Sequence, residues 1–389
     1  MKHLSNLRFG RGVAQLVGIA SVAATCAIAA CGGGVVGGGN LDDGQDSGTD
    51  FQLDGMNGDG PSIGDVPSSS DTRLDPDSAC ADSVVDATRI PPNLYMLFDH
   101  SGSMNDDVTG GTKWTLAVKA IDALVEGSPD DMNFGLKFFP PLGAPSKTCD
   151  PSFFSTPDVP VAPLSTSRAE IEAALAKASP GGETPMAIAV QTAITYMNTA
   201  KLSDGTRIVI LITDGDPNGC GSLTDVINDA TVGPTDTPPV DVYVIGAPGG
   251  TVQNLSQIAA AGNGKRTPTC VADTTDPTKS CDYEISSTDF ETELLAALKD
   301  IEGKALTCTF DVPTGGEAGT VDPSKVNVDV TDSSGDTITL DRDPTHTDGW
   351  DYTDGGATIT VYGPECDKIK TDGTEKVQII LGCKTKGPS

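Results

Sequence analysis

Arg207-Ile208-Val209-Ile210-Leu211-Ile212-Thr213, followed directly by Asp214-Gly215, is the stretch that decides the fold of this chain. Its unbroken apolar run predicts a strand buried on both faces, as in a parallel sheet covered by helices. A second run, Leu94-Tyr95-Met96-Leu97-Phe98, also leads to a carboxylate, Asp99. Ligands of open α/β sheets bind beyond the carboxyl ends of the strands, so both aspartates are expected at such an edge.

Between about residues 90 and 303, further strand patterns alternate with patterns of helical spacing. Trp114, Val118, Ile121 and Val125, for example, recur at the spacing of one helix face. The other expected strands lie near 134–138, 159–164, 240–245 and 283–285, and the other expected helices begin near 167, 184, 223, 252 and 290. This alternation predicts an α/β fold with a doubly wound, mostly parallel sheet.

After about residue 304 the pattern changes to short strands separated by turn residues. The strands are expected near 326–330, 358–362 and 377–381, with a short helix near 366–370. The alternating pair Trp350 and Tyr352 is expected in the core of this part. The sequence therefore predicts a small, disulfide-linked β module over residues 304–389, after an α/β domain over residues 80–303.

The N-terminal 30 residues have the layout of a bacterial lipoprotein signal peptide. A basic start precedes an apolar segment that ends in Ile28-Ala29-Ala30-Cys31, which resembles a lipobox. Lipidation of Cys31 would anchor the chain to a membrane, and the alternative is an ordinary cleaved signal with an incidental cysteine. Residues 31–79 are rich in Gly, Asp and Ser, which predicts a disordered linker.

The net charge and the cysteines restrict the partners and the compartment. A formal charge of −30 leaves too few basic residues for a nucleic-acid surface. Without Cys26 and Cys31, eight of the ten cysteines remain, an even number typical of disulfides in an exported protein. We expect the pairs Cys80–Cys308, Cys149–Cys220, Cys270–Cys281 and Cys366–Cys383, the first because domain ends usually lie close together.

Three separated segments carry hard oxygen donors at the ends of the predicted elements. They are Asp99-His100-Ser101-Gly102-Ser103, Gly181-Gly182-Glu183-Thr184-Pro185 and Thr213-Asp214-Gly215. Two carboxylates and three hydroxyls suit Mg²⁺, with Mn²⁺ or Ca²⁺ as alternatives. The simpler interpretation is that these residues only cap helices, since Ser, Thr and Asp are favoured caps.

In this order, Asp99-x-Ser101-x-Ser103, Thr184 and Asp214 resemble the metal-ion-dependent adhesion site of a von Willebrand factor A domain, and the likeness extends over about residues 90–303. The resemblance implies that the two serines ligate the metal directly. Thr184 and the two aspartates would ligate it directly or through water. It also implies that an acidic side chain of a partner protein fills an open coordination position.

The leading hypothesis is therefore a lipid-anchored, metal-dependent binding protein of a bacterial cell envelope. Gly32 after the lipidated cysteine favours the outer membrane, by resemblance to proteobacterial sorting. One alternative is an envelope scaffold in which the metal only stabilises the fold. A metal-dependent hydrolase is the other, but the mature chain has only His100 and His346 and carries no G-x-S-x-G or HExxH motif, so no enzyme is expected.

Overall fold

The computed structural model describes residues 83–144, 148–313, 322–372, 376–382 and 384–387. The predicted signal peptide, the lipidation site Cys31 and the linker lie outside the described residues, as do Cys80 and Cys383. Among the helices that are described, none combines the length and the apolar character needed to span a membrane.

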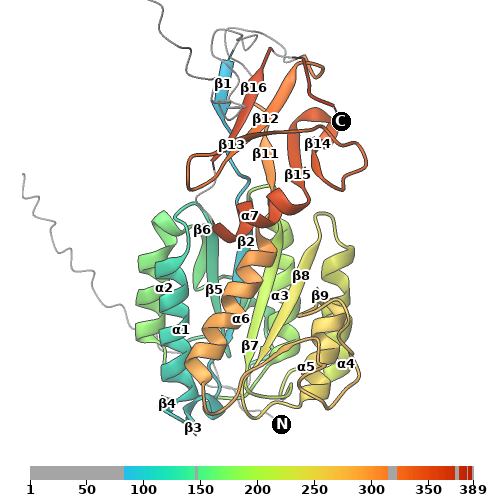
Figure 1. Cartoon of the computed structure of the whole chain (residues 1–389). Helices are drawn as coiled ribbons and strands as arrows, with labels where there is room; N and C mark the ends of the chain where they lie inside the picture. Colours follow the sequence, from blue (N-terminus) through green and yellow to red (C-terminus); the bar gives the residue numbers. More distant parts are fainter. Residues whose placement is uncertain (1–82, 145–147, 314–321, 373–375, 383, 388–389) are drawn as a thin grey trace, which may run out of the picture. The chain divides into compact units, whose positions relative to one another are not determined.

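The α/β domain is built on a seven-stranded sheet with the order β10-β8-β7-β2-β5-β6, and β9 pairs with β8 (Figure 1). Neighbouring strands are parallel except for β6, which runs antiparallel to β5. This arrangement confirms the predicted fold class. The strands are β2 (Asn93–Asp99), β5 (Asn133–Phe139), β6 (Val159–Pro163), β7 (Arg207–Thr213), β8 (Val240–Gly246), β9 (Asn263–Gly264) and β10 (Tyr283–Glu284).

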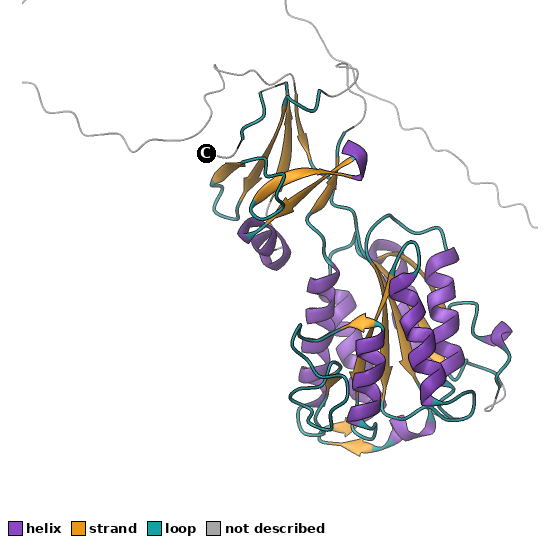
Figure 2. Ribbon diagram, turned by 90° about the vertical axis from the view of Figure 1, so that its right-hand side faces the viewer, coloured by secondary structure: helices purple, strands orange, loops and turns teal. Residues whose placement is uncertain are grey.

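Helices cover both faces of this sheet (Figure 2). One face packs against α1 (Lys113–Gly127), α2 (Leu164–Lys177) and α6 (Phe290–Ala305), and the other against α3 (Met186–Thr199), α4 (Leu223–Val232) and α5 (Val252–Ala261). The sequence of β2 is apolar throughout because both faces of the strand are covered. Leu94, Met96 and Phe98 enter the first core, while Tyr95 and Leu97 enter the second, as strand alternation requires.

The C-terminal module contains two small antiparallel sheets around their own apolar core. One sheet has the order β1-β16-β12-β13 and the other β11-β15-β14. Trp350 is fully buried in this core, as the alternating pattern predicts. Its ring meets the edge of the Tyr352 ring, with centroids 5.3 Å apart. The elements are β1 (Ser83–Asp86), β11 (Thr309–Asp311), β12 (Val326–Thr331), β13 (Thr337–Leu340), β14 (Gly349–Thr353), β15 (Thr358–Tyr362), α7 (Pro364–Asp372) and β16 (Lys376–Leu381).

Strand β1 belongs to the module although it precedes the α/β domain in the chain. It pairs antiparallel with β16 from Ser83–Leu381 to Asp86–Gln378. The backbone N–H of Ile90 then donates to the carbonyl of Thr309 in β11. The α/β domain is therefore inserted in the chain between β1 and the rest of the module's strands.

The disulfides agree with the prediction in the α/β domain and differ from it in the module. Cys149–Cys220 and Cys270–Cys281 are the predicted pairs. Cys308 pairs instead with Cys366, so the predicted pairs Cys80–Cys308 and Cys366–Cys383 are wrong. Cys308 directly precedes β11, which pairs with β15, and α7 carries Cys366 shortly after β15 ends. Strand pairing thus brings these two cysteines together.

Candidate metal centre

The two aspartates that end the apolar runs lie at the same edge of the sheet. β2 and β7 are adjacent parallel strands in which Phe98 is opposite Ile212. This register places Asp99 beside Thr213, the last residue of β7, and Asp214 follows at once. The carboxyl ends of these strands therefore carry both predicted metal-ligating carboxylates, as the sequence indicates.

Asp99 is fully buried and is held by hydrogen bonds at both carboxylate oxygens. Its Oδ1 accepts from the backbone N–H of Ser101 at 2.7 Å, and its Oδ2 accepts from the Thr213 hydroxyl at 2.6 Å. Burial raises the pKa of Asp99 to about 7, the hydrogen bonds oppose that rise, and the charge of Asp214 adds to it. A carboxylate in such a position gains from a nearby cation, which favours its charged form.

The two serine hydroxyls and Asp214 form a chain of close oxygen atoms. Ser101 Oγ lies 3.1 Å from Ser103 Oγ, and Ser103 Oγ donates to Asp214 Oδ1 at 2.7 Å. Neighbouring ligand oxygens around an octahedral Mg²⁺ are separated by roughly 2.9 Å, given its metal–oxygen distances. The spacing of these oxygens therefore fits adjacent positions around such an ion.

Thr184 reaches the same place from the loop that precedes α3. Its backbone N–H donates to Asn218 Oδ1 and its carbonyl accepts from the Asn218 N–H, both at 3.0 Å. Its hydroxyl oxygen lies 3.6 Å from the position that a Cβ atom on Gly215 would occupy. The N–H of Gly102 donates to the carbonyl of Gly182 at 3.1 Å, which joins this loop to the serine-bearing loop. The loops that carry the five predicted residues thus lie together at this edge of the sheet.

The donor atoms of the candidate site are of the kind that hard cations prefer. In the described part of the chain, no three His, Cys, Asp or Glu side chains gather closely enough to hold a metal ion. The site of Asp99 and Asp214 instead adds the hydroxyls of Ser101, Ser103 and Thr184, all of which are hard oxygen donors. Hard oxygens suit Mg²⁺, Mn²⁺ or Ca²⁺ better than the softer transition metals.

Lys113 is a part of the site that the sequence analysis missed. Its ammonium Nζ lies 2.7 Å from Asp214 Oδ2 and 3.4 Å from Asp106 Oδ2. Lys113 is the first residue of α1, where a positive charge opposes the helix dipole, and this unfavourable placement is a signal that the sequence does offer. Asn218 and Thr213 also act as positioning residues: the loop residue Asn218, for which the sequence favoured a turn role, holds Thr184, and Thr213 holds Asp99.

His100, between the first two site residues, faces the core. Its ring stacks on Phe138 with centroids 5.5 Å apart and also contacts Trp114. Burial lowers the pKa of His100 to about 4, with a smaller contribution from the charge of Lys137. The ring is therefore neutral at pH 7 and packs as part of the core, while its neighbours Asp99 and Ser101 belong to the candidate site.

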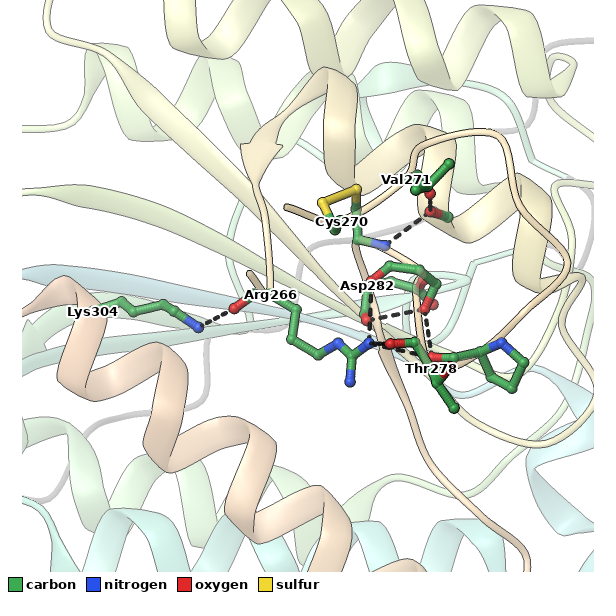
Figure 3. The surroundings of a disulfide bond; sticks show 10 residues. Arg266, Cys270, Val271, Thr278, Asp282 and Lys304 are labelled. Atoms are coloured by element: carbon green, nitrogen blue, oxygen red, sulfur yellow. Dashed lines mark hydrogen bonds between the residues drawn. A yellow bond between two sulfur atoms is a disulfide. The ribbon is translucent and has the colours of Figure 1, made fainter. Parts of the chain in front are cut away.

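A second pair of buried carboxyl groups lies on β10 and the residue before it. A Cβ atom on Gly246 of β8 would lie 3.2 Å from Asp282 Oδ2 and 3.4 Å from Glu284 Oε1, so both groups lie over one point of the sheet. Both carboxyl oxygens of Asp282 and the Oε1 of Glu284 are buried. The nearby Arg266 guanidinium donates to the carbonyls of Thr278, Pro277 and Ser280 and holds the disulfide-closed loop in place (Figure 3).

Replacing Glu284 by Gln is expected to make stability less dependent on pH. Burial and the adjacent Asp282 raise the pKa of Glu284 from its ordinary 4.5 to about 8. Glu284 therefore contributes fully to the free energy of unfolding below about pH 4.5, where it is neutral in both states. This contribution is lost as the pH rises towards 8, because the carboxyl then ionises more readily in the unfolded state than in its buried position in the folded state. We expect Glu284→Gln to raise the Tm by about 5 °C at pH 8 and to change it less at pH 5.

Thermal melts from pH 5 to pH 8.5 measure this effect. Glu291→Gln is the matched control, because Glu291 is an exposed carboxylate of the same domain, with its side chain 48% exposed. If Tm depends on pH as steeply in Glu284→Gln as in the natural chain, Glu284 and Asp282 are not buried together as described.

Comparison with known proteins identifies the class of the domain. Residues 93–280 match the family model of the von Willebrand factor type A domain, so this chain contains such a domain. A comparison with curated protein sequences finds no match.

Solved structures with a similar fold include a von Willebrand factor type A protein from Catenulispora acidiphila, with 13% identity and a TM-score of 0.40 over 79% of this chain. They also include the pilus adhesin SpaC from Lactobacillus rhamnosus GG, with 16% identity and a TM-score of 0.42 over 76% of this chain. The PilB minor pilin from Streptococcus sanguinis has 12% identity and a TM-score of 0.39 over 56% of this chain and 62% of its own. The chain spans 60% and 40% of the first two proteins.

Proposed function

We propose that this chain is a cell-envelope protein that binds a partner protein through a divalent cation. Asp99, Ser101, Ser103, Thr184 and Asp214 would hold the cation, with Mg²⁺ as the first candidate. The observation that carries the proposal is the chain of oxygen contacts from Ser101 through Ser103 to Asp214, at 3.1 and 2.7 Å. That spacing suits neighbouring ligands of one ion.

The partner would contribute an acidic side chain to the metal. Two carboxylates from the chain leave a divalent ion able to attract a third, and a hard cation prefers an oxygen ligand. Binding needs no bond to be broken, so we propose a binding role and not a catalytic one. Capture of a partner carboxylate would then depend on the metal and on both aspartates.

The location that we propose is the outside of the cytoplasmic membrane. The three described disulfides are typical of an oxidising, extracytoplasmic compartment. The lipobox-like Ile28-Ala29-Ala30-Cys31 supports attachment through lipid on Cys31, and Gly32 supports sorting to the outer membrane. Residues 31–79 would serve as the tether between the lipid and the folded part.

Capture experiments with envelope extracts from the host bacterium test this function. We expect the immobilised chain to retain a partner in Mg²⁺ and to release it in EDTA. The Asp99→Asn variant should retain at least about tenfold less of it, because the variant removes one charge that holds the ion. If the same partner is retained equally in EDTA and by Asp99→Asn, binding through the metal is wrong, and a scaffold role with other contacts takes its place.

A further inference from the structure

Lys113 is a buried cation at a helix end that disfavours positive charge, and its nearest anion is Asp214 of the candidate site. The residue is only 4% exposed, and it begins α1, whose N-terminal end carries the positive pole of the helix dipole. A buried ammonium costs free energy unless it is paired and hydrogen-bonded. Its position therefore requires a specific anionic partner.

Asp214 is that partner, and each of its two carboxylate oxygens accepts a hydrogen bond from a different side chain. Oδ2 accepts from Lys113 Nζ at 2.7 Å, whereas Oδ1 accepts from the Ser103 hydroxyl at 2.7 Å. The side chain of Asp214 is 0% exposed, so water does not compensate its charge. Asp106, the other neighbour of Lys113, lies farther away at 3.4 Å and has a side chain that is 66% exposed.

The loop after β8 closes the space around this ion pair. Gly249 has a φ of 131°, and a Cβ atom there would lie 2.6 Å from the Asp214 carbonyl oxygen and 3.4 Å from Lys113 Nζ. A side chain at this position would collide with the backbone. The ammonium is thus confined beside Asp214, on the side of the carboxylate away from the serine hydroxyls.

We propose that Lys113 is the resident counter-cation of this site: it neutralises Asp214 when no metal is bound, and it weakens the binding of a divalent cation. The first part rests only on the ion pair. The second part rests on the proposed function, because it requires that the site binds a metal. Lys113 would act as a positioning and affinity-setting residue, since it acts on the metal through Asp214.

The positive charge of Lys113 also affects how strongly the metal-loaded site attracts a partner carboxylate. Asp99 and Asp214 contribute two negative charges, and Lys113 contributes one positive charge. A bound divalent cation therefore leaves one net positive charge, which a partner carboxylate would neutralise. Without Lys113 the loaded site would be neutral and would attract an anionic oxygen less strongly. Lys113 would thus lower the affinity of the site for the metal and raise the affinity of the metal-loaded site for an acidic partner.

Thermal melts of the full chain in EDTA test the first part. Lys113→Met keeps much of the side-chain volume but leaves the charge of Asp214 buried and unpaired. Removal of one partner from a buried ion pair is strongly destabilising, and we expect the Tm to fall by about 10 °C. Lys119→Met is the matched control on the same helix, because Lys119 is 60% exposed and is expected to change the Tm by no more than about 1 °C.

A double variant separates charge from packing. If Lys113 acts by its charge, Lys113→Met combined with Asp214→Asn should recover most of the loss in Tm, because neither charge is then left alone. A Tm in EDTA that is unchanged in Lys113→Met overturns the proposal. So does a double variant whose loss equals the sum of the losses of the single variants.

Titration calorimetry with MgCl₂ tests the second part. We expect Lys113→Met to bind Mg²⁺ about tenfold more tightly than the natural chain, since one repelling charge is removed. Equal or weaker binding in the variant overturns the affinity role. If the natural chain itself binds no Mg²⁺, the proposed function fails, but the melts in EDTA still decide whether Lys113 neutralises Asp214.

Discussion

Asp99→Ala is expected to lose Mg²⁺ binding by at least about a hundredfold, the largest effect of any single change in the site. Asp99 supplies one of the two carboxylates, and its buried position leaves no water to replace the lost charge. It also holds the Ser101 N–H and the Thr213 hydroxyl, so its removal releases the loop that carries both serines. Titration calorimetry with MgCl₂ measures the affinity, and EDTA-treated chain provides the metal-free start.

Asp107→Ala is the matched control for this prediction. Asp107 is an exposed carboxylate at the start of the short strand β3 (Asp107–Val108), and no predicted ligand position falls on it. The control should bind Mg²⁺ within about twofold of the natural chain, because a surface charge is screened by salt. A loss in Asp107→Ala as large as that in Asp99→Ala would mean that the general acidity of this region binds the ion and not the five-residue site.

The α/β fold could be predicted because its central strands are buried on both faces. In β2 and β7 nearly every residue must be apolar, and such runs are visible without knowledge of the neighbours. The helices that cover the sheet then show the regular spacing of one apolar face. Predicted and observed bounds of these elements differ by only a few residues, mostly at helix ends, where fraying makes bounds uncertain.

The module was harder to predict because its strands are short and their pairing is not local. The four residues of β1 alternate between half-buried and exposed positions, and their partner β16 begins at Lys376. Nothing in a short segment such as Ser83–Asp86 identifies a partner so far along the chain. The same limitation explains the wrong pairing of Cys308, whose true neighbour is fixed by the β11–β15 ladder.

The sequence could predict where the five candidate residues lie, but not which residues support them. Asp99, Ser101 and Ser103 are read from one short motif, and Thr184 and Asp214 complete it at the starts or ends of elements. The supporting residues Lys113, Thr213 and Asn218 act through directions of side chains that only the folded chain fixes. A Lys at the start of α1 could have been questioned from the helix dipole, but its partner could not have been named.

Removal of the Cys149–Cys220 disulfide is expected to destabilise the α/β domain and to weaken metal binding together. The bond closes a loop with a sequence separation of 71 residues, which implies a loss of about 4 kcal/mol in the free energy of unfolding, or about 10 °C in Tm. Cys220 lies two residues after Asn218, whose two hydrogen bonds position Thr184. We therefore expect Cys149→Ser with Cys220→Ser to bind Mg²⁺ about tenfold more weakly.

The second disulfide of the domain separates these two effects. Cys270–Cys281 closes a shorter loop with a separation of 11 residues, and its removal should cost about 3 kcal/mol. The loop that it closes carries none of the five site residues, so Cys270→Ser with Cys281→Ser should keep the natural Mg²⁺ affinity at a temperature well below its Tm. A similar loss of affinity in both double variants would show that Mg²⁺ binding follows global stability. A loss confined to Cys149→Ser with Cys220→Ser would show that the disulfide holds the Asn218 loop, and through it Thr184, in the geometry that the ion requires.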